Sequence, residues 1–213
     1  MAGVIEVSHP LIENHLARLR DKSTGPAEFR LLIQRLAVLL AYEATKDLEL
    51  APVEVETPLA SKTCYVLKHR IGLIPILRAG LGMVDPILNL LPRAEVWHLG
   101  LYRDERTARP VEYYKKIPDH QPVEIALILD PMLATGGSAT AALETLREWG
   151  VPSIKLLSVI GARDGIREVE THFPEVQIFV CTVDDHLNEQ KFIVPGLGDA
   201  GDRIFNTPSG NTE

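Results

Sequence analysis

The sequence has little cysteine, fewer basic than acidic side chains and no long apolar run. Its two cysteines, Cys64 and Cys181, stand in 213 residues, so a disulfide framework or a two-cysteine metal site is not expected. The 22 basic residues against 29 acidic ones give a net charge of −7, which argues against broad contact with nucleic acid or an anionic membrane. The most apolar predicted helix, 29–42, contains Gln34 and Arg35 and is too short to span a bilayer. With no signal-peptide pattern, we expect a cytoplasmic protein with two free, buried thiols.

Repeats, low-complexity blocks and linkers are not seen, and this length suits one α/β domain with a sizeable core. Helical spacing predicts a helix capped by Ser8 and further helices at 27–46, 83–91, 139–149 and 165–172. Apolar, β-branched runs predict strands at 63–67, 71–77, 95–102, 123–129, 153–161 and 177–183. This alternation predicts an α/β fold with a mostly parallel central sheet flanked by helices. We divide the domain into a helical segment at 1–60, an α/β core at 61–190, a glycine-rich segment at 191–205 and a tail at 206–213.

The most informative stretch is an apolar strand that ends in an acid and continues into a glycine-bearing loop. Asp130 follows the predicted strand 123–129, and ligands of an open α/β sheet bind beyond the carboxyl ends of its strands. Adjacent glycines leave backbone N–H groups unobstructed, and the helix behind them adds a partial positive charge. The loop therefore suits a phosphate group, and its residues are Pro131, Met132, Leu133, Ala134, Thr135, Gly136, Gly137 and Ser138.

This loop lacks the lysine that an ATP-binding P-loop places after its glycines. An acid five residues ahead of Thr-Gly-Gly-Ser instead resembles the signature of the phosphoribosyltransferases, which use phosphoribosyl pyrophosphate (PRPP). Asp130-Pro131 replaces the usual pair of acids, and in this the chain resembles the uracil phosphoribosyltransferase branch, whose Asp-Pro-Met-Leu-Ala-Thr-Gly-Gly-Ser stands here at 130–138. The resemblance implies a type I phosphoribosyltransferase-like fold, with the ribose hydroxyls held by Asp130 and the 5′-phosphate by the loop. A glycine-rich turn in any β–α–β unit is the alternative.

A second predicted strand, 71–77, also ends in a glycine-bearing turn. Arg78 offers a fork of donors that suits phosphate oxygens, and Gly80 and Gly82 permit a tight backbone path. By resemblance this Arg-Ala-Gly turn is the pyrophosphate loop, so that PRPP would be held at both of its ends. An arginine that only caps a neighbouring helix is the alternative.

The region around 102–122 is dense in charge, and Pro110 interrupts its pattern. We expect it to form a protruding β-arm whose charges are mostly solvated. Arg103 is the exception, because Tyr-Arg after a strand matches the family position that reaches the pyrophosphate.

The third candidate site, Gly196 to Gly201, satisfies the dinucleotide fingerprint GxGxxG. The context argues against that function, because too few residues follow for the second half of a dinucleotide-binding unit. Backbone N–H and C=O groups can instead match the carbonyl, N–H, carbonyl order along one edge of uracil. Cytosine reverses part of that order and would leave buried groups unpaired. The segment is similar to the uracil-binding stretch of the same family, which implies uracil contacts by Ile193, Gly198, Asp199 and Ala200. A purely structural turn is the alternative.

The resemblance covers nearly the whole chain and implies one reaction, in which uracil and PRPP give UMP and diphosphate in pyrimidine salvage. It implies catalytic roles for Arg78, Arg103, Asp130 and Asp199, the last of which also faces PRPP. We expect Mg²⁺ to be bound mainly through substrate oxygens and water, because the sequence has no carboxylate cluster with metal-ligand spacing. No histidine is assigned to catalysis. We expect a homodimer or homotetramer, with GTP as a candidate activator.

Two other functions stay open. A phosphoribosyltransferase for another nucleobase would share the phosphate loop but not the segment 193–202. A pyrimidine-sensing, RNA-binding regulator of the same fold would need a basic face, and the net charge of −7 counts against it.

Overall fold

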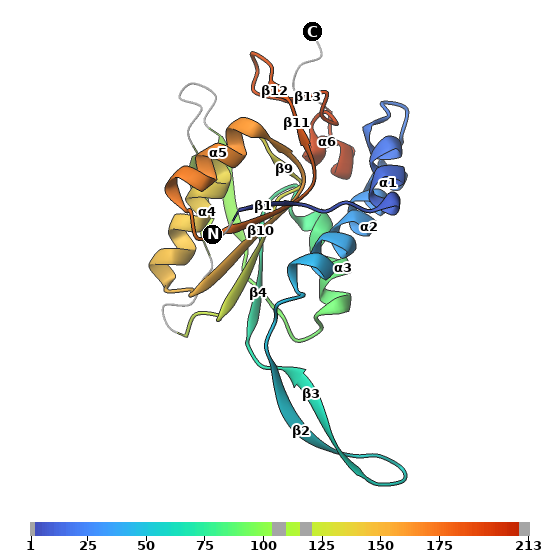
Figure 1. The fold of residues 1–213 in the computed structure, drawn as a ribbon. Coiled ribbons are helices and arrows are strands. Elements are labelled where there is room, and N and C mark those ends of the chain that lie inside the picture. The colour runs from blue at the N-terminus through green and yellow to red at the C-terminus, as the bar shows by residue number, and fades with distance from the viewer. Residues whose placement is uncertain (1–2, 104–109, 116–120, 209–213) are drawn as a thin grey trace.

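The computed structural model describes residues 3–103, 110–115 and 121–208, with the backbone alone at 101–103, 110–113 and 115. Within these residues one large sheet has the strand order β1-β11-β10-β8-β4-β6-β7 (Figure 1). Its described strand pairs are parallel except for β6 with β7. The predicted α/β class with a mostly parallel central sheet is therefore confirmed. The strands are β1 (Val4–Glu6), β4 (Ile71–Leu77), β6 (Leu99–Arg103), β7 (Pro110–Lys115), β8 (Ile125–Leu129), β10 (Ser153–Ala162) and β11 (Gln177–Asp184), with short β5 (Glu95–Val96) beside β4 and β9 (Met132–Leu133) beside β10.

Helices cover both faces of this sheet (Figure 1). One face packs against α1 (Pro10–Arg20), α2 (Pro26–Ala44) and α3 (Leu81–Leu90), and the other against α4 (Gly137–Trp149) and α5 (Arg163–His172). Along β8, Leu127 and Leu129 belong to the first of these two apolar clusters, and Ala126 and Ile128 to the second. Alternate side chains of a strand point to opposite faces, so a strand covered on both sides is apolar throughout. No helix in the described ranges is long and apolar enough to cross a membrane.

Several helix boundaries differ from their predicted positions by one or two residues, and α3 and α5 each start two residues early. The N-cap of α1 is His9 rather than Ser8, and its Nδ1 accepts a hydrogen bond of 3.1 Å from the Leu11 N–H. Pro10 explains the shift, because proline suits the first helical position and places the cap directly before it. The end of α2, at Ala44, precedes the predicted end by two residues. The start of α4, at Gly137, also comes two residues early, so the last two residues of the predicted phosphate loop, Gly137 and Ser138, belong to the first helical turn.

A hairpin of β2 (Leu50–Glu56) and β3 (Ser61–Leu67) projects from the body of the molecule (Figure 1). This corrects two expectations, because 1–60 is not wholly helical and the predicted strand 63–67 lies outside the central sheet. The chain reverses at 57–60, where Thr57 Oγ1 donates to the Ala60 carbonyl at 2.7 Å. Cys64 lies on β3 and is half-buried rather than buried, whereas Cys181 is buried, and both thiols are free.

The region predicted to form a protruding arm contains the antiparallel pair β6 and β7. Strand β6 is joined to the central sheet through β4. Residues 104–109 and 116–120 of the predicted arm lie outside the described residues. Within the described part of the chain, the hairpin that projects from the body is β2–β3 (Figure 1). The sequence analysis did not predict this hairpin.

Candidate active site

The turn after β4 and the loop after β8 lie side by side because these two strands are parallel neighbours. Pro75 of β4 is in register with Leu129 of β8, so Arg78 and Asp130 follow strand ends at the same edge of the sheet. A Cβ on Gly80 would stand 2.3 Å from the Leu129 carbonyl oxygen. Only glycine permits so close an approach of the two backbones. The structure thus brings together the two segments that were predicted to bind phosphate.

The loop after β8 leads into a helix whose first turn has no side-chain cap. Gly136 is the N-cap of α4, with φ of +85° and no capping side chain. The Gly137 N–H lies 3.5 Å from Thr135 Oγ1. N–H groups in a first helical turn, together with the helix dipole, provide a site for an anion. Before that turn, Met132 and Leu133 form β9 and Ala134 and Thr135 continue the loop, and Gly137 and Ser138 then open α4.

Helix α5 supports this loop from behind. A Cβ on Gly165 would stand 2.5 Å from the Ala134 carbonyl oxygen, and one on Gly136 would stand 2.9 Å from the Gly165 carbonyl oxygen. The backbones are therefore in close contact at two points, which restricts how far the loop can move. The sequence analysis assigned no role to Gly165, because its partner lies 31 residues earlier in the chain.

Asp130 directly follows β8 and begins the loop after it. Burial raises the pKa of its carboxyl group to about 7, and the hydrogen bond of 3.3 Å from the Met132 N–H opposes this rise. The carboxylate therefore lacks compensating partners for its charge in the unliganded protein. Hydroxyl donors from a ligand would supply them, which fits the role in binding ribose that the resemblance implies.

The Arg78 guanidinium lies against α6 (Ala200–Phe205). Its Nη2 donates to Asp202 Oδ1 at 3.2 Å, and the guanidinium carbon lies 6.0 Å from the centre of the Phe205 ring. Asp202 also accepts a hydrogen bond of 2.6 Å from Thr207 Oγ1. The Arg78 side chain is 55% exposed, so its other donors can reach a ligand. Its partner is a side chain rather than a helix C-terminus, which disfavours the alternative of a simple cap.

Asp199 begins α6. Its Oδ1 accepts a hydrogen bond of 2.8 Å from the Asp202 N–H, which makes it the N-cap of this six-residue helix. The glycines before it, Gly196 and Gly198, both have positive φ, so this backbone follows a path that other residues rarely adopt. The chain therefore forms a tight turn here that presents backbone groups. The strand directly before it, at Ile193–Val194, lies outside the central sheet, whereas a dinucleotide-binding unit requires a strand of that sheet there.

A cavity of about 320 Å³ joins the three predicted segments. All four predicted uracil residues line it, together with Met132 and Ala134 of the phosphate loop and Ala79 of the turn after β4. The sequence analysis missed Gln190, Lys191 and Phe192, which connect β12 (His186–Leu187) to β13 (Ile193–Val194) and also line the cavity. Their position directly before Ile193, a predicted uracil residue, was the signal that could have found them. Arg103 ends β6, beside β4, and its side chain lies outside the described residues.

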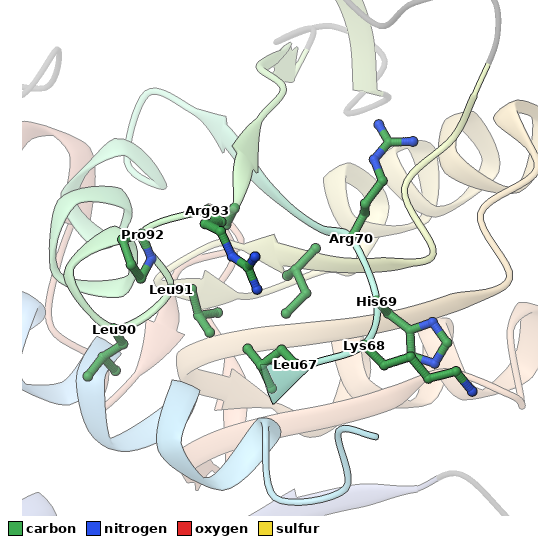
Figure 2. A pocket seen from close by; sticks show the side chains of 10 residues that line it. Leu67, Lys68, His69, Arg70, Leu90, Leu91, Pro92 and Arg93 are labelled. Atoms are coloured by element: carbon green, nitrogen blue, oxygen red, sulfur yellow. The ribbon is translucent and has the colours of Figure 1, made fainter. Parts of the chain in front are cut away.

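A second hollow, of about 260 Å³, lies at the opposite end of β4, between the base of the β2–β3 hairpin and the end of α3 (Figure 2). Its apolar wall includes Leu67, Ile71 and Leu91. Figure 2 shows the Arg93 guanidinium directed toward this wall, whereas Arg70 points away from it. Among the described residues that line this hollow, none was predicted to bind substrate, so it is separate from the candidate active site.

The structure places a loop suited to phosphate and a turn that bears an arginine at adjacent strand ends. One cavity joins them to a segment that presents backbone groups. These are the features expected of a phosphoribosyltransferase. The family model described as "Uracil phosphoribosyltransferase" matches residues 6–207. The chain belongs to the uracil phosphoribosyltransferase family.

Individual relatives agree with this assignment. The chain is 53% identical to the uracil phosphoribosyltransferase of Roseiflexus castenholzii, covering 97% of this chain and 100% of that protein. It is 52% identical to the protein of the same name from Desulfitobacterium hafniense, with the same coverage. Among solved structures, a protein from Aquifex aeolicus superposes with a TM-score of 0.92 at 38% identity, over 97% of this chain and 99% of that one. An adenine phosphoribosyltransferase from Rhodothermus marinus shares the fold, with a TM-score of 0.50 at 17% identity over 70% of this chain and 78% of that one.

Proposed function

We propose that this protein transfers the phosphoribosyl group of PRPP to uracil, giving UMP and diphosphate in pyrimidine salvage. The observation that carries the proposal is the cavity in which the segment 190–201 faces the loop after β8 and the turn after β4. One face of this cavity presents backbone groups to a base, and the adjoining strand ends present N–H groups and an arginine to phosphates.

In the proposed reaction the bond between ribose C1 and the diphosphate oxygen breaks, and a bond from C1 to uracil N1 forms as the N1 proton is released. The protein contributes mainly by positioning the reactants and by stabilising charge as it develops. Asp130 accepts hydrogen bonds from the ribose hydroxyls, and its negative charge lies near the cationic ribosyl group. Arg78 and Arg103 neutralise charge on the departing diphosphate, while the first turn of α4 holds the 5′-phosphate in place.

Mg²⁺ is the cofactor that we propose, bound mainly through the oxygens of PRPP. Asp199 and Asp130 each use Oδ1 for a backbone N–H, and each carboxylate has a second oxygen that suits water bound to Mg²⁺. Within the described ranges no group of three or more His, Cys, Asp or Glu side chains could hold a metal ion. A metal carried by the substrate fits this set of donors, and it would add positive charge to the diphosphate leaving group.

The base is selected, in this proposal, by the backbone of Ile193, Gly198 and Ala200. Main-chain groups cannot exchange donor for acceptor, so a base with the wrong order along its edge leaves buried groups unpaired. Each such mismatch costs about 1–3 kcal/mol, which is enough to discriminate strongly against cytosine.

The experiment that tests this function supplies PRPP and Mg²⁺ with each of uracil, cytosine, adenine, guanine, hypoxanthine and orotate, and measures nucleotide and diphosphate. UMP from uracil alone is the expected result. Turnover of a different base would contradict the uracil assignment while leaving the PRPP site intact. Absence of turnover, with tight and salt-sensitive binding of RNA, would favour the regulator instead. Adding GTP to the same assay tests whether it is an activator.

Replacing Arg78 with glutamine is expected to lower kcat about 10²-fold, because a fixed positive charge on the leaving group is lost. Steady-state rates at saturating uracil measure the effect. Arg93→Gln is the matched control, since Arg93 lies on the hollow at the opposite end of β4, and its kcat should equal that of the wild type. Wild-type turnover by the Arg78 variant would remove this residue from the active site.

We also propose that the protein is a homodimer or homotetramer that works in the cytoplasm, where a polyanion such as PRPP is retained. The β2–β3 hairpin supports self-association, because Leu50, Leu59 and Tyr65 expose 56%, 96% and 66% of their surface on it. Apolar side chains gathered on one projecting element are typical of an interface. Light scattering after size-exclusion chromatography measures the mass, and a monomer at micromolar concentration would contradict this proposal.

A further inference from the structure

Gly196 lies in the turn that separates Ile193 from Gly198, and both of its backbone polar groups are bound by a single ion pair. The Gly196 N–H donates to Asp184 Oδ2 at 2.9 Å, and the Gly196 carbonyl accepts from Arg20 Nη1, also at 2.9 Å. The two side chains pair with each other through two further hydrogen bonds, of 2.8 and 2.6 Å. We call Arg20 and Asp184, with these four bonds, the Gly196 clamp.

The clamp connects parts of the chain that are far apart in sequence. Arg20 is the last residue of α1 and Asp184 is the last residue of β11. The Asp184 side chain is 5% exposed and that of Arg20 is 26% exposed, so water screens the pair poorly. The pairing is bidentate, which fixes the orientation of the guanidinium as well as its position.

The backbone around Gly196 also leaves no room for a side chain. Its φ is +57°, and a Cβ there would stand 2.1 Å from the Ile193 carbonyl oxygen. The next residue is held in the same way, since Arg203 Nη1 donates to the Leu197 carbonyl at 2.8 Å and to the Leu19 carbonyl at 2.9 Å. The carbonyl groups of Gly196 and Leu197 are thus each bound by an arginine. Arg20 is the last residue of α1, and Arg203 also binds a carbonyl group near the end of that helix.

We propose that Arg20 and Asp184 are positioning residues that determine affinity and selectivity for the base without touching it. This inference rests on the proposed function, in which backbone groups of the segment 193–200 read the edge of uracil. Such groups discriminate only if they are held in place before the base arrives, because a flexible loop could turn its N–H and C=O groups to suit cytosine. The clamp holds the centre of this segment from outside the cavity, and none of the described residues lining the cavity is Arg20, Asp184 or Gly196.

The test compares kcat and the KM values for uracil and PRPP in four variants. Arg20→Lys keeps the charge but loses the fork, and Asp184→Asn keeps the shape but loses the charge. The double variant Arg20→Gln/Asp184→Asn removes both charges, so that no buried charge is left unpaired if a single variant fails to fold. Arg18→Gln is the matched control, because Arg18 lies on the same helix as Arg20 and its ion pair, with Glu28 of α2, is exposed.

We expect the KM for uracil to rise about tenfold in the clamp variants, with the KM for PRPP changing less than about threefold. The preference for uracil over cytosine, measured as the ratio of kcat/KM values, should fall about tenfold as well. The control should match the wild type in every constant.

Folded clamp variants with a lowered melting temperature but an unchanged KM for uracil would overturn the inference, because the pair would then serve stability alone. If the double variant folds and keeps wild-type selectivity, the inference also fails. A wild type that makes no UMP would instead contradict the proposed function. Hydrogen exchange at 193–198 would still test the clamp in that case, since the Gly196 N–H should lose its protection in the double variant and keep it in Arg18→Gln.

Discussion

Replacing Asp130 with asparagine is expected to lower kcat/KM for PRPP about 10²–10³-fold while the fold stays intact. Asparagine has nearly the same shape and can still accept the Met132 N–H, so the loop should keep its path. What disappears is the negative charge that we place against the ribose hydroxyls and the cationic ribosyl group. Charge-assisted hydrogen bonds are about twice as strong as neutral ones, and no described acid would replace this one at the end of β8.

Steady-state kinetics with varied PRPP measures this effect, and circular dichroism checks the fold. Asp85→Asn is the control, since Asp85 is an exposed acid on α3, and its kinetics should be those of the wild type. If Asp130→Asn turned over at more than about a tenth of the wild-type rate, the proposed ribose contact would be wrong.

The same variant should be more stable than the wild type at alkaline pH. The pKa of Asp130 is raised from 3.8 to about 7 by burial, so the folded state binds this proton more tightly than the unfolded state does. The contribution of the protonated group is fully present below pH 4, falls as the pH rises and is lost above pH 7. Asparagine carries no such penalty, and we expect a gain on the order of 4 kcal/mol at pH 8 and less than about 1 kcal/mol at pH 4. Urea unfolding of unliganded protein at both pH values measures it, and equal stability at pH 8 would contradict the raised pKa.

Replacing Gly80 with alanine is expected to cost on the order of 3 kcal/mol of stability and most of the activity. The φ of Gly80 is −58°, which any residue can adopt, so the effect would come from space alone. A methyl group would stand 2.3 Å from the Leu129 carbonyl oxygen and 2.8 Å from the backbone nitrogen and oxygen of Ile76. Backbone atoms inside a sheet cannot yield, so the turn bearing Arg78 would have to move away from Asp130.

Gly82→Ala is the matched control two residues further on. Its methyl group would meet Ile204 Cδ1 at 3.2 Å, which is the end of a flexible side chain, and alanine favours the helix that Gly82 occupies. We expect its stability to lie within about 1 kcal/mol of the wild type. Urea unfolding and the rate of UMP formation measure both variants. Equal behaviour of the two would show that the separation of β4 and β8 at this point does not depend on Gly80.

Much of the fold could be predicted because its signals are local. The strands 71–77, 123–129 and 177–183 agree with the structure within one or two residues, since each is covered on both faces and therefore mostly apolar. The β2–β3 hairpin was missed for the opposite reason. Most of its residues are exposed, so burial imposes no apolar run on 50–56. Its alternation is limited to the four residues 53–56, and Pro52 interrupts the pattern before them.

The sequence by itself determined the class of fold, the family and the loops that bear the candidate chemistry, because a strand end, a pair of glycines and an acid are neighbours along the chain. Only the tertiary structure decided what surrounds them. The raised pKa of Asp130 depends on its burial in the folded chain, and Arg78 meets Asp202 across 124 residues. Arg20 reaches Asp184 across 164 residues. Such pairs leave no periodic pattern in a single sequence, since they arise only when packing of the helices and the sheet brings distant segments together.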